Sequence, residues 1–188
     1  MWNEKIPTTM KKVPFQNTNV VLREYDFETD PEKLAVHLFN MMSSLEENIQ
    51  SIREGDKWLD DPHHFRKRLV ADIEGELSAT TTIEQGFNPW IEHRYTLYSV
   101  VTAQQYQGSG LSQILFEYVK EWIAERGGTL ILVDTWENNI PARKFYEKMG
   151  FNQFGSLPNG LKSRDKSGYV AEILYFLEID KNSNQNGF

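Results

Sequence analysis

Two glycines, Gly108 and Gly110, stand directly before a long stretch with the apolar spacing of an α-helix. Glycine adopts positive φ without strain and lets a ligand approach the bare main chain. The first turn of a helix has N–H groups without intrahelical acceptors, and it lies at the positive end of the helix dipole. A phosphate would supply those acceptors, so residues 103–110 predict an anion site. A tight turn that binds nothing is the alternative.

Two common phosphate-binding motifs do not fit this turn. A P-loop needs Lys and then Ser or Thr after its last glycine, but Leu111 and Ser112 stand there. A dinucleotide-binding motif needs a first glycine at the strand end and a third one at the position of Gln113. The turn therefore predicts another kind of phosphate ligand.

The turn resembles the signature of the GNAT superfamily of acyl-CoA-dependent N-acetyltransferases. That signature is Gln or Arg, two residues, Gly, one residue, and Gly or Ala, and it is matched by Gln105, Gly108 and Gly110. A second block fits the family pattern Asn-x-x-Ala-x-x-x-Tyr-x-Lys-x-Gly-Phe. The matching residues are Asn139, Ala142, Tyr146, Lys148, Gly150 and Phe151. The resemblance covers nearly the whole chain from Val20 onward.

The resemblance implies that acetyl-CoA is the co-substrate. The main chain of the glycine turn would hold the pyrophosphate, through Gln105, Gln107, Gly108, Ser109, Gly110, Leu111 and Ser112. The strand before the turn would pair with the pantetheine arm, as an added strand pairs with a sheet edge. The remaining contacts would come from Val100, Val101, Thr102, Asn139 and Tyr146. Thr102 replaces the usual aliphatic residue and Gln104 a common proline, which leaves main-chain contacts intact.

The resemblance also makes Tyr146 the catalytic acid. A phenol, with a reference pKa of about 10, can protonate a thiolate whose parent thiol has a pKa near 8.5. The main-chain N–H of Val100 would stabilise the oxyanion. No covalent intermediate is needed, in keeping with the absence of cysteine. The alternatives are structural: Tyr146 as a core aromatic residue, and Asn139 as a helix N-cap.

The sequence does not determine the general base. Some family members carry a glutamate on the strand before the glycine turn, but that position is Arg94 here. Glu92 is the catalytic candidate that we carry forward, with His93 and Glu84 as further candidates. Each of these residues would otherwise be an ordinary surface residue.

The composition limits the other classes of function. A net charge of −7 and a pI near 5.2 argue against a nucleic-acid partner. An acidic protein attracts cationic substrates, although solubility alone also explains the charge. The chain has no cysteine and its four histidines form no ligand pattern, so we expect no metal. No signal peptide or membrane span is recognisable, which predicts a cytoplasmic protein without a membrane partner. A homodimer is left open.

The periodicity predicts an α/β (α+β) fold, and the resemblance implies a single GNAT domain at 17–180. Its mixed, mostly antiparallel sheet has about six to seven strands and is flanked by about four helices. The expected strands are 20–25, three antiparallel strands within 64–102, 130–135, 151–154 and 169–179; the expected helices start at Asp30 and span 45–53, 110–126 and 140–149. The ends, 1–16 and 181–188, are predicted to be flexible.

The helix after the glycines has the clearest pattern. Its apolar positions step by three and one, which keeps them on one stripe. They are Leu111, Ile114, Leu115, Tyr118, Val119, Trp122 and Ile123. We predict that this stripe packs on the sheet.

The main functional prediction is acetyl transfer from acetyl-CoA to a primary amine of a small-molecule or peptide-like acceptor by direct attack. One alternative is a GNAT-fold module that binds acyl-CoA as a sensor or docking domain without catalysis, which Arg94 in place of glutamate would favour. The other is an unrelated α/β protein in which both motifs are coincidental.

Overall fold

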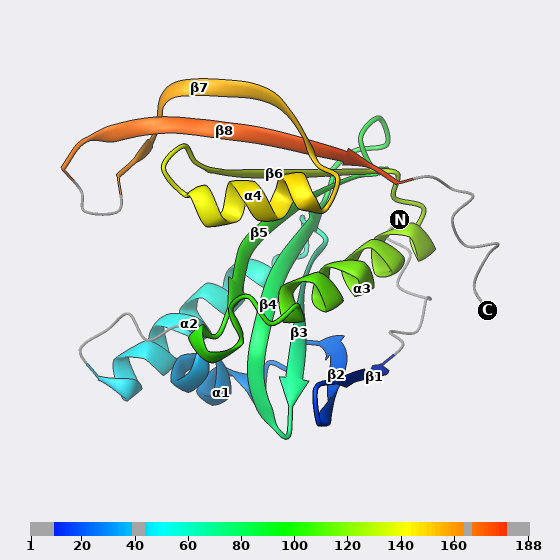
Figure 1. Ribbon diagram of the computed structural model, residues 1–188, viewed down its shortest axis with the longest axis vertical. Helices are drawn as coiled ribbons and strands as arrows, with labels where there is room; N and C mark the ends of the chain where they lie inside the picture. Colours follow the sequence, from blue (N-terminus) through cyan, green and yellow to red (C-terminus); the bar gives the residue numbers. More distant parts are fainter. Residues whose placement is uncertain (1–9, 39–43, 164–166, 180–188) are drawn as a thin grey trace.

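The computed structural model describes residues 10–38, 44–163 and 167–179 (Figure 1). Its strands form one eight-stranded sheet in the order β1-β2-β3-β4-β5-β6-β8-β7. The strands are β1 (Lys11–Phe15), β2 (Thr18–Glu24), β3 (Arg66–Ile73), β4 (Glu76–Gln85), β5 (Arg94–Thr102), β6 (Leu130–Trp136), β7 (Asn152–Lys162) and β8 (Tyr169–Glu178). All neighbouring strands are antiparallel except β5 and β6. The predicted mixed, mostly antiparallel sheet is confirmed.

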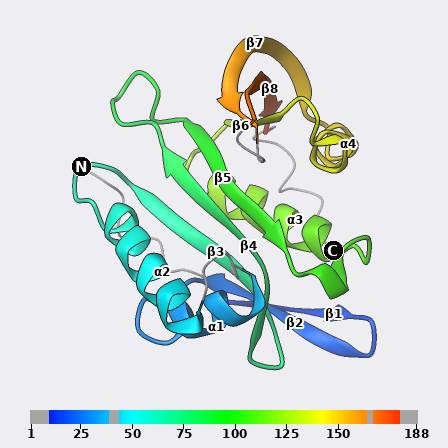
Figure 2. The same ribbon diagram turned by 90° about the vertical axis from the view of Figure 1, so that its left-hand side faces the viewer.

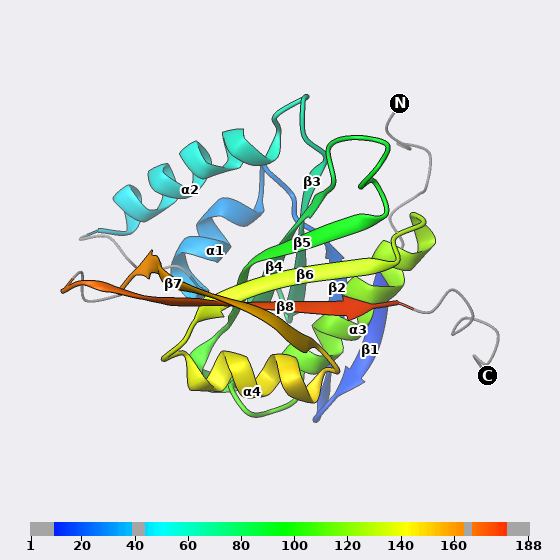
Figure 3. The same cartoon turned by 90° about the horizontal axis from the view of Figure 1, so that it is seen from above.

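Helices lie on both faces of the sheet. They are α1 (Asp30–His37), α2 (Leu45–Leu59), α3 (Leu111–Glu125) and α4 (Ile140–Lys148), and a 3₁₀ turn, η1 (Gln104–Tyr106), precedes α3. Figures 2 and 3 show α1 and α2 on one side of the sheet and α3 and α4 on the other. The four helices within the described part of the chain match the expected number.

The sheet has eight strands instead of the expected six to seven, and β1 lies inside the segment 1–16 that was predicted to be flexible. The strand pairs antiparallel with β2, and Phe15 is buried in the main core. Pro14 suggested irregular structure, but β1 is an edge strand, where a missing N–H is tolerated. The rest of the two predicted flexible ends, 1–9 and 181–188, lies outside the described residues.

Two further elements are longer than predicted. Helix α2 continues through Gly55 to Leu59, because Leu59 is buried and Asp56 bonds to groups on the sheet. Strand β7 continues to Lys162 instead of ending at residue 154. The residues 158–160, Pro-Asn-Gly, are typical of turns. In the structure they lie within β7, where the register with β8 shifts between Leu157 and Leu161.

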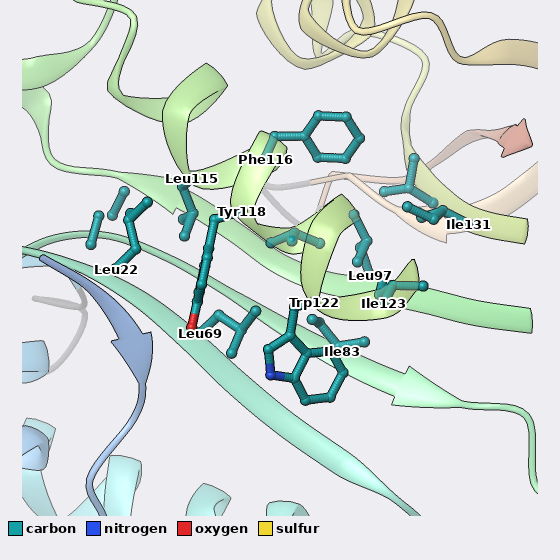
Figure 4. Packing of buried hydrophobic residues seen from close by; sticks show 14 of the residues in the cluster. Leu22, Leu69, Ile83, Leu97, Leu115, Phe116, Tyr118, Trp122, Ile123 and Ile131 are labelled. Carbon is teal, nitrogen blue, oxygen red and sulfur yellow. The ribbon is translucent and has the colours of Figure 1, made fainter. Parts of the chain in front are cut away.

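The predicted stripe of α3 packs on the sheet as expected. All its members are buried except Ile114, which is partly buried, and Phe116 joins them. Figure 4 shows Tyr118 and Trp122 reaching towards Leu69 and Ile83 on the strands below. Burying one such large apolar side chain contributes about 1.5–3 kcal/mol, so these contacts hold α3 on the sheet.

The two parallel strands diverge after a short pairing. Strand β5 pairs with β6 only from Arg94 to Thr96, although β5 continues to Thr102. The ladder of β5 with β4 is bulged between Thr80 and Thr82, and Ser99 on β5 has a φ of 51°. A bulge bends and twists its strand, which turns β5 away from β6. The edge of β5 from residue 97 to 102 is therefore left without a partner in β6.

Candidate active site

A pocket lies where β5 diverges from β6, and it collects most of the parts that the sequence singled out. It is lined by Thr81, Leu97, Val100, Val101, Thr102, Ser112, Leu115, Phe116, Val119, Phe145 and Tyr146. These residues come from β4, β5, the first half of α3, and α4. The unpaired edge of β5, the first half of α3, which follows the glycine turn, and Tyr146 thus meet at one place, although they are far apart in the sequence.

The glycine turn presents main-chain N–H groups that have no acceptor. Among the described residues, no hydrogen bond is made by the N–H groups of Gly108, Gly110 and Ser112. They lie at the N-terminus of α3, where the helix dipole adds positive potential. By contrast, the Gln107 N–H donates to the Gln104 carbonyl. This geometry fits a phosphate that accepts several N–H bonds.

Both glycines are required by their backbone conformation. Gly108 has a φ of 75°, and Gly110, the N-cap residue of α3, has a φ of 95°. A Cβ at either position would meet no atom within 4 Å, so the space beside the turn is open. The left-handed conformation, and not crowding by the protein, is what excludes other residues here.

Side chains around the turn hold its shape. The Thr102 and Ser112 hydroxyls are 2.7 Å apart and link the end of β5 to the start of α3. Ser109 donates its hydroxyl to the Tyr106 carbonyl and accepts the Leu111 N–H at 3.3 Å. Leu111 is fully buried in the core and its N–H is already bonded. Of the residues predicted to bind phosphate, Leu111 is therefore the one least available.

Tyr146 lies on α4 with its ring in the core and in the wall of the pocket. Its ring packs against Phe151 and Tyr175, and only 5% of its surface is exposed. Its hydroxyl makes no hydrogen bond with the described residues. Burial, and then the charge of Asp134, raise the pKa of Tyr146, so the phenol keeps its proton at neutral pH. Tyr146 is thus a core aromatic residue that also lines the pocket, and its catalytic role stays a prediction.

Asn139 occupies the N-cap position of α4 but makes no side-chain capping bond. Its amide instead donates to the hydroxyl of Thr135, which is buried on β6, at 3.0 Å. Asn139 therefore occupies the predicted N-cap position, but the capping hydrogen bond to the helix is not formed. The contact ties the start of α4, and with it Tyr146, to the end of β6.

A family model for the acetyltransferase (GNAT) family matches residues 34–151. The chain belongs to this family. Streptothricin acetyltransferase of Escherichia coli is 34% identical over 56 residues, which are 30% of this chain and 32% of that protein. The chain thus matches about a third of the length of this curated relative.

Solved GNAT structures have the same fold. Ribosomal-protein-S18-alanine N-acetyltransferase from Escherichia coli superposes with a TM-score of 0.66 at 17% identity, over 90% of this chain and 99% of that one. Ribosomal L7/L12 α-N-protein acetyltransferase in complex with coenzyme A gives a TM-score of 0.69 at 15% identity, over 92% and 100%. At these identities the likeness shows the shared fold.

Glu92 is not among the residues that line the pocket. Glu92 is exposed in the loop before β5, and its carbonyl accepts a bond from the Gln85 side chain. It lies at the opposite end of β5 from Thr102, roughly 30 Å away at the rise of an extended strand. His93 and Arg94 stand at the same distant end. We therefore do not retain Glu92 as the general base.

Glu84 faces the α2 side of the sheet but is already paired. Its carboxylate accepts two bonds from the Arg66 guanidinium, the shorter at 2.7 Å, and lies 3.0 Å from the His64 ring. Arg66 itself lies over the Trp58 ring. A carboxylate held in this way joins α2 to the sheet, and its bonds to Arg66 and His64 explain its presence without a catalytic role.

A residue that the sequence reading missed lies close to the pocket instead. Asp134 stands in the middle of β6, and its charge is close enough to raise the pKa of Tyr146. A signal was present in the sequence, because Asp134 is an acid inside the otherwise apolar strand "LILVDTW". Such an acid on a central strand is unusual and points to a function or to a buried partner.

The sequence also predicted that the protein has no metal and no membrane partner. Within the described ranges, no three His, Asp or Glu side chains come together as a metal-binding group. No described helix combines the length and apolar character that a bilayer span requires. The cytoplasmic location stays a prediction.

Proposed function

We propose that the protein transfers an acetyl group from acetyl-CoA to a primary amine by direct attack. The observation that carries this proposal is a pocket lined by the unpaired edge of β5, by Ser112 at the start of α3, and by Tyr146. The free N–H groups of the glycine turn directly precede Ser112 in the chain. A site for coenzyme A needs the strand edge and these N–H groups, and the phenol of Tyr146 would be the proton donor for the leaving thiolate.

Different residues of the chain would bind the co-substrate and catalyse the transfer. The N–H groups of Gly108, Gly110 and Ser112 would bind the pyrophosphate, and β5 from Val100 to Thr102 would bind the pantetheine arm through its main chain. Acetyl-CoA, when bound, supplies an activated acyl group. The N–H of Val100 would stabilise the oxyanion, and the Tyr146 hydroxyl would give its proton to the sulfur.

For the acceptor, we propose a cationic small molecule with a primary amine, such as streptothricin. Two observations support this class: the similarity to streptothricin acetyltransferase and the net charge of −7. A peptide N-terminus is the second candidate, because GNAT enzymes of the same fold act on the N-terminal alanine of a ribosomal protein. A homodimer remains a prediction.

The direct test is release of free thiol from acetyl-CoA in the presence of streptothricin or of a peptide that begins with alanine. We expect turnover with at least one of them. Tyr146→Phe should lower kcat about 10²–10⁴-fold, because one proton transfer loses its donor. Its affinity for coenzyme A should change much less.

Tyr118→Phe is a matched control, because Tyr118 is also a buried tyrosine but is not among the residues that line the pocket. It should keep its turnover. Coenzyme A binding without turnover on either amine would favour the sensor or docking module. Equal kcat values for Tyr146→Phe and the wild type would remove Tyr146 from the mechanism.

A further inference from the structure

We propose that Asp134 accepts the proton from the attacking amine. The role of Asp134 rests on the proposed function and supplies the proton acceptor that the sequence left open. It follows from the register of the strands, the missing partners of the carboxylate, and its effect on neighbouring groups.

The register places Asp134 at the divergence of β5 and β6, facing α2. Thr96 of β5 pairs with Leu132 of β6, the last pair before the strands separate. Two residues further along each strand are Tyr98 and Asp134, which therefore point to the same face as that pair. The Tyr98 ring packs edge-on against Trp58 of α2, with centroids 5.8 Å apart, so this is the α2 face.

Tyr146 lies on the other face of the same strands. On β6, Val133 points opposite to Asp134 and pairs with Tyr175 of β8. The Tyr175 ring packs on the Tyr146 ring, with centroids 5.8 Å apart. Asp134 and Tyr146 thus flank the divergence from opposite faces. An amine that reacts between them would have a proton acceptor on its own side and a proton donor on the side of the leaving sulfur.

The Asp134 carboxylate has no structural task in the described part of the chain. It is half-buried, yet neither a hydrogen bond nor an ion pair reaches it there. Two carboxylates that are buried more deeply are paired: Asp56 with Arg68 at 2.9 Å, and Asp72 with Arg23 at 2.9 Å. Burying an unpaired carboxylate costs free energy, so packing does not explain this residue.

The surroundings of Asp134 favour proton uptake. Burial raises its pKa, which brings the carboxylate closer to the strength of a useful base at neutral pH. The titratable groups around it are Glu172 on β8, Tyr146 on α4 and Tyr98 on β5. The pKa of Glu172 and of Tyr146 is raised by burial first and then by the charge of Asp134. The pKa of Tyr98 is raised by burial first and then by Glu84, and Asp134 adds a smaller contribution. A protonated amine would be attracted to this acidic side of the divergence.

The proposed step balances as follows. The amine nitrogen forms a bond to the acetyl carbonyl carbon while the carbon–sulfur bond breaks. Before the nitrogen–carbon bond forms, the protonated amine gives one N–H proton to an Oδ atom of Asp134. As the carbon–sulfur bond breaks, the Tyr146 hydroxyl proton passes to the sulfur, and the phenolate takes up the second proton that the nitrogen loses. The products are an amide and a free thiol, and Asp134 returns to its ionised form by releasing its proton to solvent.

The test compares Asp134→Asn with Glu172→Gln, which removes a neighbouring charge on the same face. Wild type and variants are assayed with acetyl-CoA and either streptothricin or the alanine-initiated peptide. We expect kcat/KM of Asp134→Asn to fall about 10²–10³-fold at pH 7, with unchanged affinity for coenzyme A. Its rate should then rise about tenfold per pH unit as the amine loses its proton without help, a response that a structural role would not produce.

Asp134→Glu retains a carboxylate and should recover part of the lost rate, whereas Glu172→Gln should mainly raise KM. A rate for Asp134→Asn within threefold of wild type would overturn the proposal, as would an equal kcat loss in Glu172→Gln. If the wild type acetylates neither amine, the proposed function fails and the role of Asp134 fails with it. An active wild type with an active Asp134→Asn contradicts the role of Asp134 alone.

Discussion

At the scale of single residues, Asp134 is expected to reduce stability. Burial raises its pKa in the folded chain above the unfolded value, so the residue supports folding at low pH, and that support is lost as pH rises through the folded pKa. Asp134→Asn should therefore have a higher Tm than wild type at pH 7.5. The difference should shrink as pH falls towards 4. Thermal melts at several pH values measure both.

Asp26→Asn is the control of opposite sign. The Glu28 and Thr29 N–H groups donate to the Asp26 carboxylate and lower its pKa, so its charged form supports the fold. Its removal should lower the Tm at pH 7.5, with less effect in acid. A Tm for Asp134→Asn that stays below wild type at neutral pH would mean that the carboxylate has a stabilising partner.

Gly110 tests the glycine turn at the same scale. Its φ of 95° makes a side chain unfavourable by roughly 1–2 kcal/mol. Gly110→Ala should lose about that much stability in urea unfolding and should also bind coenzyme A more weakly, because the main chain at the N-terminus of α3 must shift. Gly75→Ala carries the same strain, with a φ of 91°, in the turn between β3 and β4.

The two glycine variants should differ only in binding. Both positions have open space for a Cβ within 4 Å, so the stability losses should be similar. Calorimetric titration with coenzyme A should show an affinity near wild type for Gly75→Ala and a clear loss for Gly110→Ala. Equal affinities would show that the conformation of the turn does not matter for binding.

At the scale of elements, α2 is held on the sheet by a buried ion pair. The Arg68 guanidinium donates to Asp56 at 2.9 Å, and the Tyr25 hydroxyl donates to the other carboxylate oxygen. Arg68→Met should cost about 3–5 kcal/mol, because Asp56 would stay buried without its cation. The exposed pair of Lys11 and Glu121 offers the comparison, and Lys11→Met should cost under about 1 kcal/mol. Urea unfolding curves measure both, and equal losses would contradict the buried pair's role.

The elements also show how far sequence patterns reach. The stripe of α3 and the two motif blocks were predictable because helical periodicity and glycine chemistry are local. The lengths of α2 and β7 were not predictable from local preference. Gly55 is unfavourable inside a helix and Pro158 inside a strand, but the tertiary contacts of these elements override that preference. An acid inside β6 is visible in the sequence, but the proposed role of Asp134 depends on which strands separate. The bulge of β5 that separates them leaves no local signal in the sequence.

At the scale of the whole molecule, the parts of the proposed site lie on both faces of the sheet, beside the point where β5 and β6 diverge. The glycine turn and Tyr146 lie on the α3 and α4 side, whereas Asp134 and Tyr98 lie on the α2 side. The negative net charge favours a cationic molecule as the acceptor, and the positive end of the α3 dipole would favour the phosphates of the proposed co-substrate in spite of that charge.

The global consequence is that coenzyme A should stabilise the entire fold. Its site joins β5, α3 and α4, so binding requires the folded state and shifts the unfolding equilibrium by mass action. At a concentration one hundred times its Kd, the gain is about 2.7 kcal/mol, or roughly 5–11 °C in Tm for a chain of this size. Thermal melts with coenzyme A measure this gain, and dephosphorylated pantetheine, which lacks the pyrophosphate, should give a much smaller shift. Equal shifts would show that the glycine turn does not bind phosphate, and no shift with either would favour an unrelated ligand for the pocket.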